Sequence, residues 1–551
     1  MWIHPSALLA PALRRSLRIA LWMLAAALGL SRFLWLAADF PNYSPWMIDQ
    51  AKFTDEGWWA NAAIMHALTG HWHIAGDYNP AVALPVWPLL LGALFHFTGV
   101  SVIAVRALNV AVSLATLAVV YLLVRRYAQS RAAAQAAVLL FAASPFAFAF
   151  SRLAILDTLV VFEFCAMLLV ASCAANATNA GRQRVWPLVV LALLVTMALL
   201  TKTTAAVLIP AVIWLAFRAS ANSPANGPNS TPLTETSPWG PRFSTPLTEA
   251  CPWGPRLSTP LTETSPWGPR FWRALFCTLI AVVIAPFALL KLWALFVSRL
   301  GYGADYNYFF GVNAMPDIDW PQTLHWLHDL GQNGFWIDRL LYPLALAILL
   351  AAIALKRNLW RNPLFAASWM AIAGGAIFIF SRQDDYAPRY FLVMLAPVVF
   401  IVVLAFDDAL RSSRRAAGVL AAAMAIAVAF DSVAIANYLS HRQYQLYGAA
   451  RQIAATVRAD RSRSQLLFGV SAAEVGLIAG LPSINGAYGI DDMGAKVARY
   501  KPGWYLAWND EIDHDALAGY ALVPVAAYRI FDDDDRTTLT LYRLEGTGTR
   551  E

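Results

Sequence analysis

Two adjacent acidic residues, Asp55 and Glu56, begin a stretch rich in aromatic residues, FTDEGWWAN (residues 53–61). The stretch follows the first long apolar run of the chain. Charged groups near a membrane are costly to desolvate, so such carboxylates either face water or take part in a site. A carboxylate among apolar groups can serve as a general base toward a hydroxyl group. The alternative to a catalytic role is a structural one, in which the two carboxylates begin a solvated loop or lie together at a helix N-terminus.

Further ionisable residues stand at the ends of later apolar runs, where they suit the binding of a phosphate group. Arg152, Lys202 and Arg389 are the candidate cations, because arginine can contact a phosphate through two N–H groups and lysine supplies a point charge. Asp157 is a second candidate catalytic carboxylate, and its alternative is a helix cap paired with Arg152. Instead of binding a phosphate, Lys202 could extend its side chain so that the ammonium group reaches the membrane surface. Tyr390, beside Arg389, is a candidate for substrate binding.

The stretch HWHIAGDYNP (residues 71–80) adds Tyr78 as another candidate for substrate binding. Three histidines lie in or near it, at positions 66, 71 and 73, and they raise the question of zinc. A metal site needs a preorganised set of ligands, so polar contacts at the interface are the favoured interpretation. We therefore predict no metal site and no required cofactor. A divalent cation at Asp55 or Glu56 stays open as an alternative.

The elements that position these residues are predicted to be membrane helices. Hydrophobic residues make up 59% of the 551 residues and charged residues 14%, against about 25% in soluble domains. Apolar runs long enough to cross a bilayer recur along the chain. We predict a mainly α polytopic fold of about eleven transmembrane helices, at residues 19–38, 102–124, 132–150, 157–175, 185–200, 203–217, 274–290, 340–355, 364–380, 390–406 and 416–437.

Arginine and lysine residues alternate between the loops that join these runs, which predicts the orientation. Basic residues before the first run and in every second loop predict a cytoplasmic N-terminus and an outer C-terminus. The expected location is the inner (plasma) membrane of the cell. The first run is long and has no small-residue cleavage site after it, which favours a membrane helix over a signal peptide. The formal net charge of +7 is then a topology signal. No basic face on a soluble domain suggests nucleic acid as a partner.

The predicted transmembrane domain spans residues 1–437 and includes two long outer loops. Residues 39–101 form the first, which would carry the chemistry on two interfacial helices, one following Asp55 and one at 83–97. Residues 298–339 form the second. Residues 219–272 form a cytoplasmic insertion that holds three near-copies of a 14-residue proline-rich unit such as STPLTETSPWGPRF. We interpret the insertion as disordered and inert, with a proline-rich ligand or a membrane-docking tryptophan as alternatives.

Residues 438–551 change in character and predict a small α/β domain outside the membrane. Helices are expected at 445–459 and 472–479, and strands near 465–470, 503–508, 520–530 and 537–544. We find no catalytic constellation in this domain. Its acidic run DDDD (residues 532–535) is more typical of a solvated turn than of a cation site.

Four motifs in order resemble one family. They are DEGWW after the first run, SRLAILDT after the third, LLTKTTAAVLIP between the fifth and sixth, and APRYFLVMLAP near the end. Together they resemble the polytopic C-type (GT-C) glycosyltransferases that use polyprenyl-phosphate sugars, in particular the protein O-mannosyltransferases and the aminoarabinose transferase of lipid A. The resemblance covers about residues 19–406. It implies a catalytic role for Asp55, with Glu56 beside it, and for Asp157. The chain departs from the pattern at Thr203-Thr204, where relatives often have Gly-Pro.

The resemblance implies transfer of a sugar from a polyprenyl-phosphate donor to a hydroxyl acceptor on a lipid, glycan or protein, at the outer face of the membrane. Direct displacement by the acceptor would invert the anomeric centre. A transporter or flippase for a lipid-linked sugar is the main alternative, although no internal repeat among the runs supports it. A scaffold that presents the outer domain is a third, and it gives no reason for charged residues to gather on one side.

Overall fold

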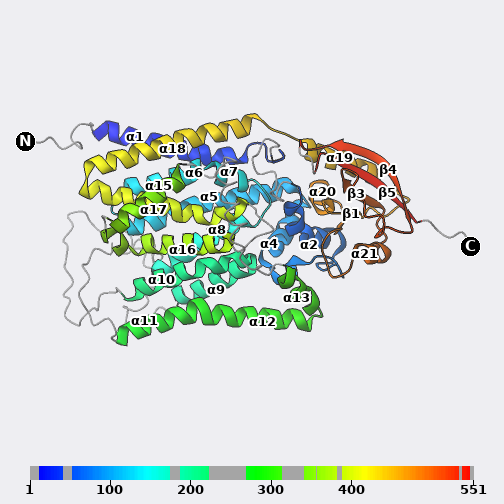
Figure 1. The fold of residues 1–551 in the computed structure, drawn as a ribbon, viewed down its shortest axis with the longest axis horizontal. Helices are drawn as coiled ribbons and strands as arrows, with labels where there is room; N and C mark the ends of the chain where they lie inside the picture. The colour runs from blue at the N-terminus through cyan, green and yellow to red at the C-terminus, as the bar shows by residue number, and fades with distance from the viewer. Residues whose placement is uncertain are drawn as a thin grey trace, which may run out of the picture.

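Long helices run side by side through most of the molecule, and a smaller unit that contains a β-sheet lies at one end of them (Figure 1). The computed structural model describes residues 11–40, 53–173, 186–221, 269–312, 340–354, 357–380, 388–532 and 536–546. The mainly α fold class with a small C-terminal sheet is therefore confirmed.

Each of the eleven predicted runs coincides with helix in the structure. The principal helices are α1 (Pro11–Leu30), α5 (Val102–Tyr127), α6 (Arg131–Ala143), α8 (Asp157–Cys173), α9 (Trp186–Thr201), α10 (Ile209–Ala221), α11 (Pro269–Leu279), α12 (Ala285–Arg299), α15 (Leu341–Ala354), α16 (Pro363–Phe380), α17 (Leu392–Ser412) and α18 (Arg414–Ser440). Serine side chains cap several of them: Ser101 accepts a hydrogen bond from Ala104 N at the start of α5, and Ser130 one from Ala133 N at the start of α6. The helix α17 is almost wholly buried and forms the centre of the bundle.

In the described part of the chain, six helical stretches are long and apolar enough to cross a membrane, and five more apolar helices are shorter. These features and the fold make the chain a multi-pass membrane protein. The number of eleven spans and the sidedness of the termini stay predictions. The runs carry few charges, yet several buried charged residues lie within them in the described part of the chain, among them Arg32 in the 3₁₀ turn after α1 (Ser31–Phe33). Arg106 is in α5, Glu163 in α8 and Asp431 in α18.

The first outer loop folds into short helices at the end of the bundle that faces the C-terminal unit (Figure 1). Its helices are α2 (Asp55–Thr69), α3 (Pro80–Ala83) and α4 (Val86–Thr98), so both helices predicted there are present. Gly70 ends α2 with a φ of 81°, a conformation that favours glycine. The helix α13 (Gly303–Val312), from the second outer loop, packs against α3.

The C-terminal unit holds a five-stranded mixed sheet with helices beside it. The strands are β1 (Leu467–Gly469), β2 (Ser483–Asn485), β3 (Trp504–Trp508), β4 (Tyr520–Arg529) and β5 (Thr538–Gly546), in the order β2-β1-β3-β5-β4. β1 is parallel to β2 and β3, whereas β5 is antiparallel to β3 and β4. The edge strand β4 tolerates Pro524 beside a bulge. The predicted helices coincide with α19 (Gln445–Ala459) and α20 (Ala472–Ala479), whereas β2 and α21 (Met493–Tyr500) were not predicted.

Some predictions lie outside the described residues. They concern the repeats of residues 219–272, except for the ends of that range, the acidic run at 533–535, and residues 313–339 of the second outer loop. The residues at 381–387 of the SRQDDYAPRYFL motif also lie outside, whereas Arg389 and Tyr390 are described.

Candidate active site

Asp55 and Glu56 occupy the first turn of α2, and their side chains reach different partners. Thr54 is the residue before the helix, and Asp55 is the first residue in it. An Oδ2 atom of Asp55 lies 2.6 Å from Nη2 of Arg389, which stands in the 3₁₀ turn η9 (Pro388–Phe391) just before α17. Both side chains are buried. The sequence therefore brings the first-loop carboxylate onto a cation more than 330 positions away.

Glu56 is held within the body of the helical bundle. Its carboxylate accepts hydrogen bonds from Nε (2.8 Å) and Nη2 of Arg106, and from the backbone N–H of Ala154. Arg106 also donates from Nη1 to the carbonyl oxygens of Leu36 and Ala38, each at 2.8 Å. Glu56 thus ties α2 to α5, to the SRLAILDT segment and to the chain that leaves α1. Sequence reasoning missed Arg106, although a charge inside an apolar run is a usable signal.

Asp157 pairs with Lys202, and not with Arg152 as the sequence alternative had it. Asp157 begins α8, and its Oδ1 accepts a hydrogen bond of 2.6 Å from Nζ of Lys202, which follows the last residue of α9. Both groups are buried. The chain turns sharply after Lys202 into the 3₁₀ helix η5 (Thr203–Leu208), and the threonines that depart from the family pattern begin this turn.

Tyr390 lies between the two ion pairs. The Lys202 Nζ atom is 5.1 Å from the centre of its ring, and the Arg389 guanidinium carbon is 5.5 Å from the same point. Cations within about 6 Å of an aromatic face are attracted by its quadrupole. The pairs Asp55–Arg389 and Asp157–Lys202 therefore converge on one aromatic ring. Four segments that are far apart in the sequence meet here.

Arg152 contacts the chain that follows α1. Its Nη2 donates to the carbonyl oxygens of Leu34 (2.6 Å) and Trp35 (3.1 Å), and its guanidinium stacks near Phe148 and Tyr438. Trp35 has a φ of 52°, an uncommon conformation that exposes this carbonyl edge. These contacts are those of a residue that holds the chain between α1 and the first outer loop.

Glu163 is a buried carboxyl that the sequence analysis passed over. It lies in α8 beyond Asp157, and its Oε1 accepts a hydrogen bond of 2.9 Å from the hydroxyl of Thr201. Thr201 directly precedes Lys202. The helices α8 and α9 are thus joined by two polar contacts in succession, and the second one steadies the residue next to Lys202. An acidic residue in an apolar run was again the available signal.

The C-terminal unit contacts α2 directly. Oε2 of Glu474, in α20, accepts a hydrogen bond of 2.8 Å from the backbone N–H of Gly57, one of the N–H groups at the start of α2 that have no partner within the helix. A Cβ on Gly57 would lie 2.1 Å from the backbone nitrogen of Glu474, so only glycine permits this approach. Burial raises the pKa of Glu474 above its ordinary value, as does the nearby Glu56, while Arg106 opposes the shift.

Tyr78 is held mainly through aromatic contacts. Its ring lies among aromatic residues, with centroids at 6.1 Å from Trp58, 6.0 Å from Tyr488 and 6.3 Å from Phe309. The histidines of the first loop make polar and stacking contacts: His66 stacks on Trp72, and His73 pairs with Asp305 at 3.1 Å. Among the described residues, no group of three or more His, Cys, Asp or Glu side chains is placed to hold a metal ion.

The chain is similar to known proteins both in a family model and in its fold. Residues 80–225 match the family model described as dolichyl-phosphate-mannose-protein mannosyltransferase. No curated protein matches the chain in sequence. The crystal structure of ArnT from Cupriavidus metallidurans in the apo state is similar with a TM-score of 0.55 and 13% identity, and the match covers 95% of this chain and 97% of that one. ArnT bound to undecaprenyl phosphate matches with a TM-score of 0.51, 14% identity and the same coverage. The chain therefore has the fold of the C-type polytopic glycosyltransferases, as its motifs predicted.

Proposed function

We propose that the protein is an integral-membrane glycosyltransferase that moves a hexosyl or pentosyl group from a polyprenyl-phosphate donor to a hydroxyl acceptor, with inversion. The acceptor hydroxyl belongs to a lipid, a glycan or a protein. Support for a lipid-phosphate donor comes from the match to the mannosyltransferase family model and from the fold shared with ArnT, one structure of which holds undecaprenyl phosphate.

The observation that carries the proposal is the convergence of Asp55–Arg389 and Asp157–Lys202 on Tyr390. It joins two carboxylates that can accept a proton to two cations that can bind a phosphate. A transporter would need such groups along a path through the membrane. Here they come from the first turns of α2 and α8, from the residue after α9 and from the turn before α17, and both ion pairs meet at one ring.

In the proposed reaction, the acceptor oxygen forms a bond to the anomeric carbon while the bond from that carbon to the phosphate oxygen breaks. The electrons of the broken bond stay on the polyprenyl phosphate, which gains a negative charge. Lys202 and Arg389 stabilise that charge because they are already held in place before the reaction. Arg389 suits this role because its planar guanidinium matches the geometry of phosphate oxygens.

Asp55 takes the proton of the acceptor hydroxyl as the new bond forms. We assign this role to Asp55 because its partner, Arg389, is one of the two cations proposed to stabilise the phosphate. Glu56, in contrast, accepts hydrogen bonds from Arg106 and from the backbone N–H of Ala154. Asp157 orients the Lys202 ammonium, and Glu56 fixes the position of α2. The sequence assigned catalysis to all three carboxylates, and the proposal now divides the roles among them. No step requires a metal ion, although a divalent cation is compatible with it.

The test is transfer by purified full-length protein in lipid nanodiscs from a panel of undecaprenyl- and dolichyl-phosphate sugars to lipid, glycan and peptide acceptors. We expect transfer from at least one donor, with release of polyprenyl phosphate and inversion at the anomeric carbon by NMR. Flipping of a fluorescent lipid-linked sugar across the bilayer, without transfer, would overturn the proposal in favour of a flippase. We place the site on the outer face of the inner membrane, with the N-terminus cytoplasmic and the C-terminal unit outside.

A further inference from the structure

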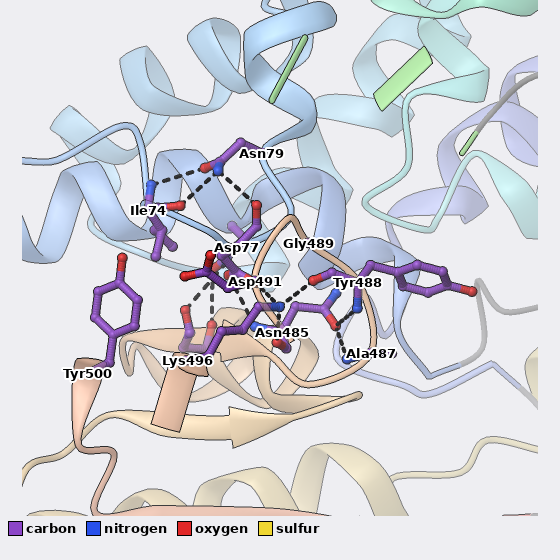
Figure 2. Close-up of polar contacts among 12 residues, drawn as sticks. Ile74, Asp77, Asn79, Asn485, Ala487, Tyr488, Gly489, Asp491, Lys496 and Tyr500 are labelled. Atoms are coloured by element: carbon purple, nitrogen blue, oxygen red, sulfur yellow. Dashed lines mark hydrogen bonds and ion pairs between the residues drawn. The ribbon is translucent and has the colours of Figure 1, made fainter. Parts of the chain in front are cut away.

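A buried ion pair joins the C-terminal unit to the first outer loop. Nζ of Lys496, in α21, lies 3.0 Å from Oδ1 of Asp77, and both side chains are almost completely buried. The same ammonium donates to the carbonyl oxygens of Asn485 (2.9 Å) and Tyr488 (Figure 2). Burial raises the pKa of Asp77 to about 6, and Lys496 opposes that shift. Because buried charges are costly unless satisfied, this pair fixes the two segments in one arrangement.

The loop that carries Tyr488 is fixed from its other side as well. Asp491 N donates to the carbonyl oxygen of Gly76 at 2.9 Å, and Gly489 N donates to the hydroxyl of Tyr308 at 3.0 Å. Gly489 has a φ of 143°, and a Cβ there would lie 2.5 Å from the Gly76 carbonyl oxygen. Only glycine fits both the conformation and the approach. The backbone of the loop is thus held by the first outer loop and by α13.

The ring of Tyr488 projects away from this polar cluster (Figure 2). Its centroid lies 5.1 Å from the Trp58 ring and 6.0 Å from the Tyr78 ring. Trp58 follows Asp55 by three positions in α2, and residues three apart in a helix lie on the same side. All three rings are half-buried, so part of each stays accessible. The C-terminal unit therefore contributes an aromatic side chain that packs on Trp58, which lies about one helical turn from the proposed base.

We propose that Tyr488, with Trp58 and Tyr78, forms an aromatic platform on which a sugar ring of the substrate stacks. The proposal rests on the proposed function, and it makes the C-terminal unit part of the substrate site. A sugar ring has one face rich in C–H groups, which packs on an aromatic face, and hydroxyl groups at its edge, which need polar neighbours. Polar groups are held next to two of these residues in the sequence, since Asp77 precedes Tyr78 and Gly489 N, after Tyr488, binds the Tyr308 hydroxyl. Either the transferred sugar of the donor or a glycan acceptor has this chemistry.

The test compares Tyr488→Ala and Tyr488→Phe with wild type, using full-length protein in nanodiscs. Tyr500→Ala is the matched control, because Tyr500 lies in the same unit and donates from its hydroxyl to the Ala75 carbonyl oxygen at 2.7 Å. In Figure 2 it stands on the other side of the ion pair from Tyr488. The measurements are the KM for each substrate of the proposed transfer, kcat, and the dissociation constant for undecaprenyl phosphate, which carries no sugar.

Tyr488→Ala should raise the KM for one sugar-bearing substrate roughly 10-fold, since aromatic contacts of this kind account for about one factor of ten. A higher KM for the donor places the donor sugar on the platform, and a higher KM for a glycan acceptor places the acceptor there. Tyr488→Phe should retain the wild-type KM, and Tyr500→Ala should raise neither KM. Binding of undecaprenyl phosphate should be the same in all four proteins.

Two results would overturn the platform and leave the proposed function intact. One is an active Tyr488→Ala protein with the wild-type KM for both substrates. The other is a sign that the substitution acts through domain docking, which would appear as an equal rise in KM in Tyr500→Ala or as weaker binding of undecaprenyl phosphate by Tyr488→Ala. A wild-type protein that transfers no sugar from any donor of the panel would overturn the proposed function itself, and the platform with it.

Discussion

At the scale of single residues, the cations of the site are held by carboxylates before any substrate arrives. Lys202 is paired with Asp157 and Arg389 with Asp55, all four largely buried. Removing one partner of a buried pair leaves the other charge uncompensated, which commonly costs about 3–5 kcal/mol. Substitutions that keep shape and polarity are therefore the informative ones, and each needs a control that separates folding from turnover.

Asp55→Asn should lower kcat by about 10²–10⁴-fold, because the amide keeps the shape of the side chain and cannot accept the acceptor proton. That loss corresponds to roughly 3–5 kcal/mol of activation free energy. Binding of undecaprenyl phosphate should change much less, and initial rates with saturating donor measure the effect. Compared with Asp55→Asn, Glu56→Gln should lower kcat less and lower the midpoint of thermal unfolding more, since it weakens the contact with Arg106. A folded Asp55→Asn protein with a near wild-type rate would refute the assignment.

Lys202→Met should weaken binding of undecaprenyl phosphate by about 10-fold or more, because hydrogen bonds to a charged group are worth about 1.5–3 kcal/mol. Turnover should fall too, since the same ammonium stabilises the leaving phosphate. Arg152→Met is the comparison, because Arg152 binds the backbone carbonyls of Leu34 and Trp35. It should lower the midpoint of thermal unfolding and leave phosphate binding unchanged. Equal affinities in wild type and Lys202→Met would remove Lys202 from the donor site.

At the scale of elements, the helix α2 depends on a group supplied by another part of the chain. Its Gly57 N–H binds Glu474 of α20, and the two helices pack without a side chain between them. A helix end that is buried without such a partner is unfavourable. The position of Asp55 in the first turn of α2 is therefore coupled to the docking of the C-terminal unit.

Glu474→Ala should destabilise the protein by about 1–3 kcal/mol, the cost of a buried N–H left without an acceptor. It should also lower kcat, because the first turn of α2 carries Asp55. Glu474→Gln should restore most of both properties, since its amide oxygen can accept the same hydrogen bond. Glu511→Ala, at an exposed glutamate of the same unit, is the control and should change neither. The midpoint of thermal unfolding and the initial rate of sugar transfer are the two measurements. A Glu474→Ala protein with the wild-type values of both would contradict the coupling.

At the scale of the whole molecule, the described start of α1 and the C-terminal unit lie at opposite ends of the helical bundle (Figure 1). The alternating Arg and Lys residues of the sequence assign the N-terminal end to the cytoplasm. The candidate site and the C-terminal unit then share the outer end. The first outer loop, α13 and α20 meet there, far from the basic connections such as that after α5.

Reporter tags should therefore show the two ends of the chain on opposite sides of the membrane. A tag fused before Met1 should report the cytoplasm and a tag after Glu551 the exterior, as measured by alkaline phosphatase and fluorescent-protein fusions. A tag after Arg126, at the basic end of α5, should agree with the N-terminal one. Both termini on one side would require an even number of spans and would overturn the outer placement of the site.

The sequence by itself determined the helices and much of the C-terminal unit, because local patterns encode local structure. Apolar runs predicted the membrane helices, and the helices expected at 445–459 and 472–479 coincide with α19 and α20. It also marked Asp55, Asp157, Lys202 and Arg389, because charged residues at the ends of apolar runs are conspicuous. The strand β2 was not predicted, since three residues carry too little periodicity. The helix α21 was not predicted either, although α20 has the same length.

Only the tertiary structure decided which of these residues meet. Lys202, and not the nearer Arg152, pairs with Asp157, because the end of α9 packs beside the start of α8. Glu474 and Tyr488 join the first outer loop across more than 400 positions of sequence. Spacing constrains residues within a few helical turns, whereas the partners of a side chain across such separations depend on how whole helices and loops pack. That is why the sequence indicated the chemistry of the site and the structure decided its pairings.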